Sequence, residues 1–389
     1  MGTGVVESFF LIFAGAALLA TAALYGRQPV LVAYIAVGCI AGPHGMGWID
    51  DPKLVSEIAE IGIIFLLFLV GLDLQPAKLR NMIGKTFLTA FVSSAVFFAI
   101  AAGIMLAFGF GVADSVIAGI ACMFSSTIVG LKLLPTTVLH HRHIGEIVVG
   151  LLLVQDLFAI LALILLAERG ESVEATLGSI VEVFIALPAL AAVAYGAVRF
   201  VVLPLVQKWD AFHEYIFLVA IGWCLTIATS AHGLGLSLEI GAFVAGVSLA
   251  TSPIALYIAE SLRPLRDFFL VMFFFSVGAA IDTRVMADVA MPTLLLALLL
   301  IAAKPVVLRA LLGWRGEAAK VSWETGIRLG QLSEFSLLVA YLATSLGLLT
   351  SEASHIVQGA TVLTFVLSTY WVIFRYPSPI AVSEKLRRN

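Results

Sequence analysis

The sequence is poor in charge. Of its 389 residues only 12% are Asp, Glu, Lys or Arg, whereas 61% are hydrophobic. An ordinary soluble domain carries about 25% charged residues, so this composition excludes one. The formal net charge of −3 gives no indication of a nucleic-acid partner, and no alternation of apolar and polar residues indicates a transmembrane barrel. We therefore predict an all-α polytopic membrane protein.

Cysteine and catalytic motifs are scarce as well. Cys39, Cys122 and Cys224 lie singly in apolar segments, which excludes a disulfide framework and a thiolate metal site. Neither a nucleophile beside a base nor an HExxH spacing is found, so we predict no enzyme, no cofactor and no structural metal. The one histidine-rich tract, His140–His143, lies in a connector, where we favour modulation by pH over a zinc site.

What the sequence has instead is apolar runs, most of which reach the length of a membrane helix. Windows of about 20 residues predict about thirteen spans. Basic residues gather on one side of them, which places the N-terminus outside and the C-terminus in the cytoplasm. The predicted spans are 7–25, 29–42, 54–72, 84–109, 112–134, 144–168, 176–206, 213–232, 237–250, 265–282, 287–312, 321–348 and 354–376.

An internal repeat relates the two halves of the chain. The run Phe68–Gly71 matches Phe275–Gly278, and the same shift of 207 residues (278 minus 71) carries Ser126 onto Ser333. Seven spans separate the starts of the copies, so the copies are inverted, which is a transporter architecture. We predict a first inverted repeat of six spans in 1–175, a linker helix in 176–208, a second repeat of six spans in 209–376 and a cytoplasmic tail in 377–389.

Polar residues interrupt two spans at corresponding places, Met123–Thr127 in one and Gly330–Glu334 in the other. Irregular backbone at membrane depth survives only where it lines a cavity or is packed in protein. We therefore predict that both spans are broken helices that cross. Glu334 is placed to neutralise the half-helix N-termini there, and Thr127 offers a hydroxyl to free amides.

Asp156 is a carboxylate inside a long apolar run and follows Gln155. Such a group costs roughly 2.5 to 3.5 kcal/mol to insert, so it usually faces an interior pathway and acts there. Burial favours the protonated form of a carboxyl, so Asp156 is predicted to hold a proton and surrender it to an arriving cation. We prefer this role to a structural ion pair. With one titrating acid, exchange of one monovalent cation for one proton is electroneutral.

The remaining polar residues of the spans have more than one interpretation. The amide of Gln155 either helps to replace cation hydration or bonds neighbouring backbone. Lys304 either pairs with Asp156 or neutralises half-helix C-termini, and we favour the second role. Glu239 is either a second-site acid or an anchor at the membrane interface, and Glu60 and Arg328 are further accessory candidates.

Five stretches carry a resemblance to a known family: Glu60–Leu74, Ser125–Thr127, Val154–Asp156, Leu236–Val247 and Leu329–Phe335. They resemble the monovalent cation:proton antiporter-2 family, and within it the Kef-type glutathione-gated potassium efflux antiporters. The Gln-Asp pair is the specific part, because electrogenic sodium relatives carry two adjacent acids there.

The resemblance implies the sodium/proton antiporter fold and a homodimer in the inner (plasma) membrane, in contact with lipid. It implies exchange of potassium, or alternatively sodium, for protons by alternating access, with the ion at Asp156 and Gln155 beside Ser125, Ser126 and Thr127. A gated cation channel is the alternative from another functional class. A channel would require rings of carbonyl or acidic groups from several subunits, whereas here the acid occurs once within an inverted repeat.

One departure from the family concerns regulation. Kef-type proteins follow the membrane part with a cytoplasmic nucleotide-binding domain, and no such domain occurs in this chain up to Asn389. We expect either that a regulatory domain or subunit lies outside this chain or that gating of that kind is absent.

Overall fold

A computed structural model of the chain describes residues 5–49, 52–73, 76–135, 143–167, 175–209, 213–234, 236–252, 255–379 and 381. Within these residues the regular structure is helical and no β-strand occurs. The described residues contain eight candidate membrane spans, together with shorter apolar helices such as Val30–Ala41 and Leu238–Ala250. An all-α polytopic membrane protein is thus confirmed, while the count of about thirteen spans stays a prediction.

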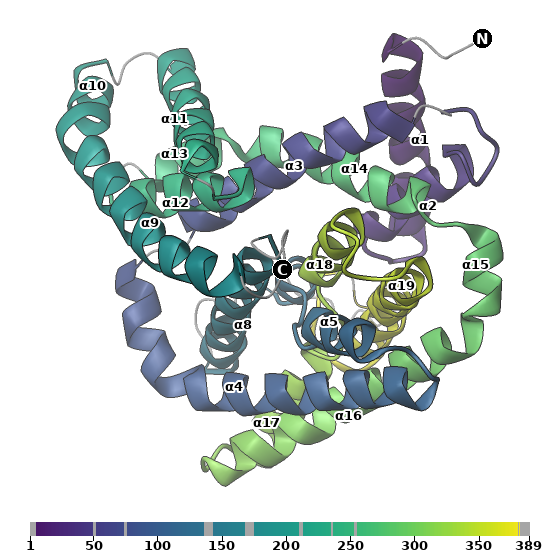
Figure 1. Cartoon of the computed structure of the whole chain (residues 1–389). Helices are drawn as coiled ribbons and strands as arrows, with labels where there is room; N and C mark the ends of the chain where they lie inside the picture. The colour runs from purple at the N-terminus through teal and green to yellow at the C-terminus, as the bar shows by residue number, and fades with distance from the viewer. Residues whose placement is uncertain are drawn as a thin grey trace. The chain divides into compact units, whose positions relative to one another are not determined.

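Figure 1 shows the described helices in chain order by colour. The first part of the chain forms α1 (Val5–Tyr25), α2 (Val30–Ala41), α3 (Pro52–Asp73), α4 (Pro76–Ala107), α5 (Val112–Cys122), α6 (Thr127–Lys132) and α8 (His143–Ala167). A continuous helical stretch follows, made of α9 (Ala175–Ala197), the π-helical turn η1 (Val198–Val202) and α10 (Leu203–Lys208). The last part forms α11 (His213–Gly233), α12 (Leu238–Ala250), α13 (Ala255–Ser261), α14 (Arg263–Ala279), α15 (Thr283–Asp288), α16 (Ala290–Trp314), α17 (Ala319–Arg328), α18 (Glu334–Ser345) and α19 (Ser351–Arg375).

The starts of several helices recur along the chain. Helix α5 begins at Val112 and α17 at Ala319, which is 207 residues later (319 minus 112), and α6 and α18 begin at Thr127 and Glu334 with the same spacing. These recurring bounds support the division into residues 1–175, a linker at 176–208, and residues 209–376. That division and the inversion of the two copies stay predictions.

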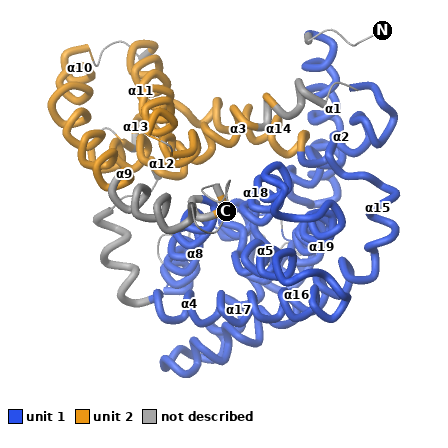
Figure 2. Tube along the Cα trace, viewed as in Figure 1, with its two compact units in different colours: residues 1–51, 81–163, 277–389 blue, residues 52–80, 164–276 orange. Residues whose placement is uncertain are grey.

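The chain forms two compact units (Figure 2). Unit 1 comprises residues 1–51, 81–163 and 277–389, and unit 2 comprises residues 52–80 and 164–276. Each unit therefore draws on both predicted repeats.

Unit 2 is built around helix α12, which packs against α3, α9 and α11. Helices α12 and α3 approach each other closely at two glycines. A Cβ atom on Gly246 would collide with the carbonyl oxygen of Phe68, and a Cβ atom on Gly71 would collide with the carbonyl oxygen of Phe243. Apolar side chains of the same helices form the buried core of this unit.

Unit 1 contains the two interrupted helices. Helix α19 packs against α16, α18 and α5, and α16 packs against α17 (Figure 1). The chain leaves helical structure between Cys122 and Thr127, and again between Arg328 and Glu334. The two spans predicted to be broken are therefore broken at the predicted places.

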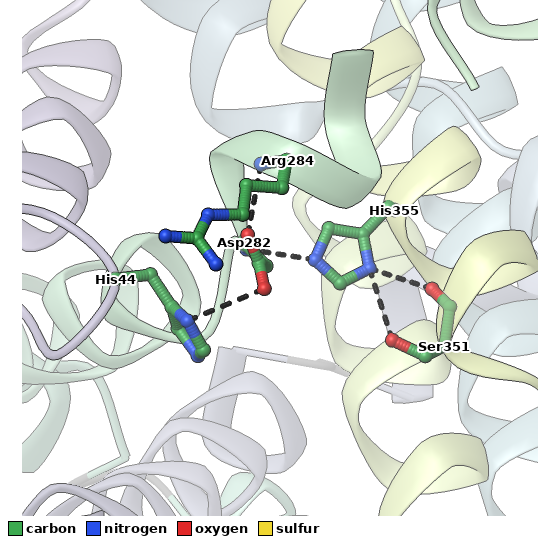
Figure 3. A network of polar contacts seen from close by, with 5 residues as sticks. All are labelled: His44, Asp282, Arg284, Ser351 and His355. Atoms are coloured by element: carbon green, nitrogen blue, oxygen red, sulfur yellow. Dashed lines mark hydrogen bonds and ion pairs between the residues drawn. The ribbon is translucent and has the colours of Figure 1, made fainter. Parts of the chain in front are cut away.

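A polar network within unit 1 holds the turn between α14 and α15 (Figure 3). Asp282 caps α15 by accepting a hydrogen bond from the Arg284 amide at 2.8 Å, and its other oxygen lies 3.5 Å from His44 Nδ1. The Asp282 amide donates to His355 Nε2 at 2.8 Å, and His355 Nδ1 lies 2.6 Å from the Ser351 carbonyl oxygen. Because an amide only donates and a carbonyl only accepts, His355 is neutral and carries its proton on Nδ1.

Candidate functional site

Asp156 lies on α8 and is almost completely buried, with 8% of its surface exposed. The hydroxyl of Thr127, the first residue of α6, lies 3.0 and 2.9 Å from the two carboxylate oxygens and donates to them. Among the described residues no Lys, Arg or His forms an ion pair with Asp156. This buried acid therefore has a hydrogen-bond donor but no countercharge within that part of the chain.

The free amides at the start of α6 are served by Ser126, and not by Thr127 as predicted. Ser126 is the N-cap of α6, and its hydroxyl accepts a hydrogen bond from the Val129 amide at 3.0 Å. The N-cap is the residue before the first helical one, and its side chain is placed to fold back onto the free amides of the first turn. Thr127 is one residue too late, which leaves its hydroxyl for Asp156.

A second carboxyl meets the same turn of helix. Glu334 lies in the first turn of α18, and its Oε1 accepts a hydrogen bond from the Ile128 amide at 3.3 Å. Its Oε2 is buried, with no hydrogen-bond partner in the structure as described. Thr127 and Ile128 are consecutive, so Asp156 and Glu334 both converge on the start of α6.

Lys304 lies on α16, is fully buried, and is bound by the two unwound segments. Its Nζ donates to the carbonyl oxygens of Phe124 at 2.6 Å and Gln331 at 2.8 Å, and to the Ser125 hydroxyl at 3.1 Å. An ammonium has three N–H donors, so all three have acceptors. These carbonyls follow the C-terminal ends of α5 and α17, where a helix carries partial negative charge.

Gln155 binds the backbone of the first break. Its Oε1 accepts a hydrogen bond from the Ser125 amide at 3.1 Å, and the Ser125 hydroxyl donates to the Leu329 carbonyl oxygen at 3.0 Å. Gln155 thus connects α8 to both breaks. Its Nε2 is buried and has no partner in the described part of the chain, so the unengaged end of this amide is a donor rather than an acceptor.

Several residues that complete this site were not predicted from the sequence. Gln331 Nε2 donates to the Ser126 carbonyl oxygen at 3.3 Å, and its Oε1 accepts from Ser368 at 2.9 Å. The Leu332 amide donates to Thr364 Oγ1 at 3.0 Å. The recurrence of hydroxyl residues every three or four positions along α19 was the signal, because it marks one helix face.

The other predicted residues take no part in the contacts described above. Arg328 is fully buried and binds Glu324 rather than Glu334. Glu239 is half-buried in the first turn of α12 and Glu60 is exposed, and both belong to unit 2.

The predicted histidine tract is described only at its end. His140, His141 and Arg142 lie outside the described residues, whereas His143 Nε2 lies 2.9 Å from Glu317 Oε1. Within the described residues no group of three or more His, Cys, Asp or Glu is gathered in a way that would hold a metal ion.

Known proteins have sequences similar to this one. The family model described as "Sodium/hydrogen exchanger, transmembrane" matches residues 9–374. K(+) efflux antiporter 6 of Arabidopsis thaliana is 28% identical over 355 residues, covering 87% of this chain and 58% of the relative. The iron transporter MagA of Paramagnetospirillum magneticum is 26% identical over 352 residues, covering 89% of this chain and 80% of the relative.

The fold has a solved counterpart. The sodium proton antiporter MjNhaP1 of Methanocaldococcus jannaschii superposes with a TM-score of 0.66 at 16% identity, covering 94% of this chain and 96% of that one. The chain spans little more than half the length of the plant relative, 58%. Since the family model covers nearly all of the sequence, the chain belongs to the transmembrane sodium/hydrogen exchanger family.

Proposed function

We propose that this protein exchanges a monovalent cation, potassium by preference, for a proton across the membrane by alternating access. The observation that carries the proposal is Asp156, a buried carboxylate that has a hydroxyl donor and, among the described residues, no cationic partner. A proton and a cation compete for its negative charge. Exchange follows if the protein changes face only when Asp156 is occupied.

The surroundings of Asp156 support this role. Lys304 donates hydrogen bonds to carbonyl oxygens of both breaks. Under the proposal it therefore stays between the two breaks and leaves Asp156 available to the cation. Gln155, Ser125 and Ser126 hold the broken backbone in place, and Thr127 stabilises the ionised form of Asp156. Glu334 keeps one protonation state through the cycle, so one cation replaces one proton.

The cellular setting belongs to the proposal as well. We place the protein in the inner (plasma) membrane as a homodimer in contact with lipid, with its N-terminus outside and its C-terminus in the cytoplasm. A cytoplasmic regulatory domain or subunit is a further expected partner. The name of K(+) efflux antiporter 6 supports potassium as the cation, and the name of the iron transporter MagA makes iron the competing candidate.

The test is transport by the purified protein in proteoliposomes that contain a pH-sensitive dye. Opposed gradients of potassium, sodium or ferrous iron are imposed in turn, and we expect potassium to drive proton movement fastest. Asp156→Asn should abolish exchange. Asp267→Asn, which changes an exposed acid in the same way, should leave it intact.

Three results would overturn the proposal. Exchange that persists in Asp156→Asn would remove the residue on which the proposal rests. Cation flux without proton counterflow would indicate a channel. Proton movement driven by ferrous iron and by neither alkali cation would replace the proposed substrate.

A further inference from the structure

Arg328 is a buried guanidinium that the proposed exchange mechanism does not use. It is the last residue of α17 and is fully buried. Its Nε and Nη2 donate to Glu324 Oε1 at 3.0 and 2.8 Å. A buried charge is costly in free energy unless it is paired and hydrogen-bonded. Glu324, one turn earlier on the same helix, supplies the opposite charge.

The remaining donors of Arg328 reach two other segments of unit 1. Nη1 donates to the carbonyl oxygen of Leu133, the C-cap of α6, at 3.0 Å. Nη2 also donates to the carbonyl oxygen of Pro377 at 2.9 Å, and the guanidinium carbon lies 5.5 Å from the centre of the Tyr376 ring. One side chain therefore joins α17, α6 and the residues that follow α19.

The segment after α19 is packed into the protein at this place. Ser378 and Ala381 are fully buried although they lie beyond the last residue of α19, Arg375. The contacts with Tyr376 and Pro377 are consequently part of a buried junction rather than a passing surface contact.

The junction lies one short helix away from Asp156. Helix α6 has six residues, a length of about 9 Å at 1.5 Å per residue. Arg328 binds its C-terminal end, and the Thr127 hydroxyl at its first residue binds Asp156. A shift of so short a helix at one end is transmitted to the other.

We propose that Arg328 is a positioning residue that ties the segment Tyr376–Pro379 to helix α6 and so holds Thr127 against Asp156. Displacement of this segment then weakens cation binding at Asp156. Anything that moves the segment would therefore regulate the cation affinity of the site. The inference rests on the proposed function for its transport readout. Its structural core, the tie between the segment and α6, is testable without transport.

The test uses Arg328→Lys, which keeps the charge but loses the planar fork, and Tyr376→Leu, which loosens the segment and leaves Arg328 and Glu324 in place. Arg375→Lys, at an exposed neighbouring position, is the matched control. We expect both test variants to raise the KM for the cation by about fivefold, as the loss of one ordinary hydrogen bond would. The maximal rate per folded protein and the KM of the control should not change.

Amide hydrogen exchange of residues 127–133 is the second readout. Both test variants should speed it and the control should not. An unchanged KM and unchanged exchange in Tyr376→Leu would overturn the proposal, as would a loss of folded protein in Arg328→Lys with a normal KM in the fraction that folds. If the wild type moves no cation while the amide exchange responds, the proposed function fails and the tie stands.

Discussion

Asp156 and Lys304, the two charged residues on which the proposed exchange depends, are satisfied in different ways. Lys304 donates three hydrogen bonds to oxygen atoms, whereas Asp156 accepts from one donor among the described residues, the Thr127 hydroxyl. Three acceptors hold the Lys304 side chain in one position. A carboxylate held by one donor remains available for a proton or a cation, and this difference leads to the next two predictions.

Thr127→Val should make exchange require a more alkaline pH. The substitution keeps the shape of the side chain and removes the donor to the ionised Asp156, a hydrogen bond to a charged group worth about 1.5–3 kcal/mol. The pH dependence of exchange should therefore move upward by about one unit, since 1.36 kcal/mol corresponds to one unit. Thr127→Ser keeps the hydroxyl and should follow the wild type. An unshifted pH profile in Thr127→Val would show that this hydrogen bond is unimportant to proton binding.

Lys304→Met should destabilise the protein by about 2–5 kcal/mol, because it leaves buried carbonyl oxygens of both breaks without a donor. Thermal unfolding of the purified protein in detergent measures the loss. Lys320→Met, at an exposed position of α17, should unfold at nearly the wild-type temperature. Equal unfolding temperatures in the two variants would mean that the contacts of Lys304 with the two breaks do not stabilise the protein.

At the scale of elements, the sequence indicated where helices break but not which side chains form hydrogen bonds with the backbone groups that the breaks leave free. Met123–Thr127 and Gly330–Glu334 were visible as polar runs in apolar spans, and both lie at interruptions. The side chains that bind the freed backbone come from elements distant in sequence: Lys304 of α16 donates to carbonyl oxygens of both breaks, and Thr364 of α19 accepts from the Leu332 amide. Their pairing therefore depends on packing that no local sequence pattern records. The N-cap role of Ser126 was missed because a shift of one residue decides which hydroxyl faces the helix and which faces Asp156.

Gly246→Ala should destabilise unit 2 by about 1–3 kcal/mol, because the added methyl would collide with the Phe68 carbonyl oxygen of α3. Gly222→Ala in α11 has no atom within 4 Å of the new Cβ, and alanine is the better helix former by about 1 kcal/mol. The two variants should thus shift the unfolding temperature in opposite directions. A stabilised Gly246→Ala would contradict the close approach of α3 and α12.

Asp282 should make the turn between α14 and α15 sensitive to acid. The hydrogen bond from the Arg284 amide, and then the charge of His44, lower the pKa of this carboxyl. A lowered pKa gives stability that is present at neutral pH and is lost as the pH falls through the folded-state pKa, which lies below that of an ordinary aspartate. The wild type should therefore unfold at a higher temperature than Asp282→Asn at pH 6, and this difference should shrink towards pH 3. Asp288→Asn, at an exposed position, should change little at either pH.

At the scale of the whole molecule, composition alone was enough for the class, and the helix bounds fall close to the predicted apolar windows. Burial in lipid makes this possible, because an unbroken membrane helix satisfies its backbone hydrogen bonds internally and needs a long apolar run of residues. The division into two units could not be predicted from the apolar runs of the sequence. Residues 52–80 join residues 164–276, and the apolar surface that decides such a pairing resembles the surface that faces lipid.

Exchange by the whole protein should be insensitive to membrane potential. Moving one net charge through 100 mV would contribute about 2.3 kcal/mol, enough to change the rate many-fold. We expect equal rates of proton movement in proteoliposomes with and without an imposed potential. A rate that rises or falls steeply with the potential would mean that a second group, Glu334 being the nearest candidate, also changes its charge during the cycle.

The three bonds of Lys304 also bear on leakage. A fixed positive charge buried among carbonyl oxygens repels any cation or proton that approaches it, as cationic barriers do in selective pores. Since all its N–H groups are engaged, it has no spare donor with which to pass a proton along a chain of water. Under the proposed exchange, Lys304 thus keeps the two breaks closed to ions, and the carrier step at Asp156 is the route by which ions cross.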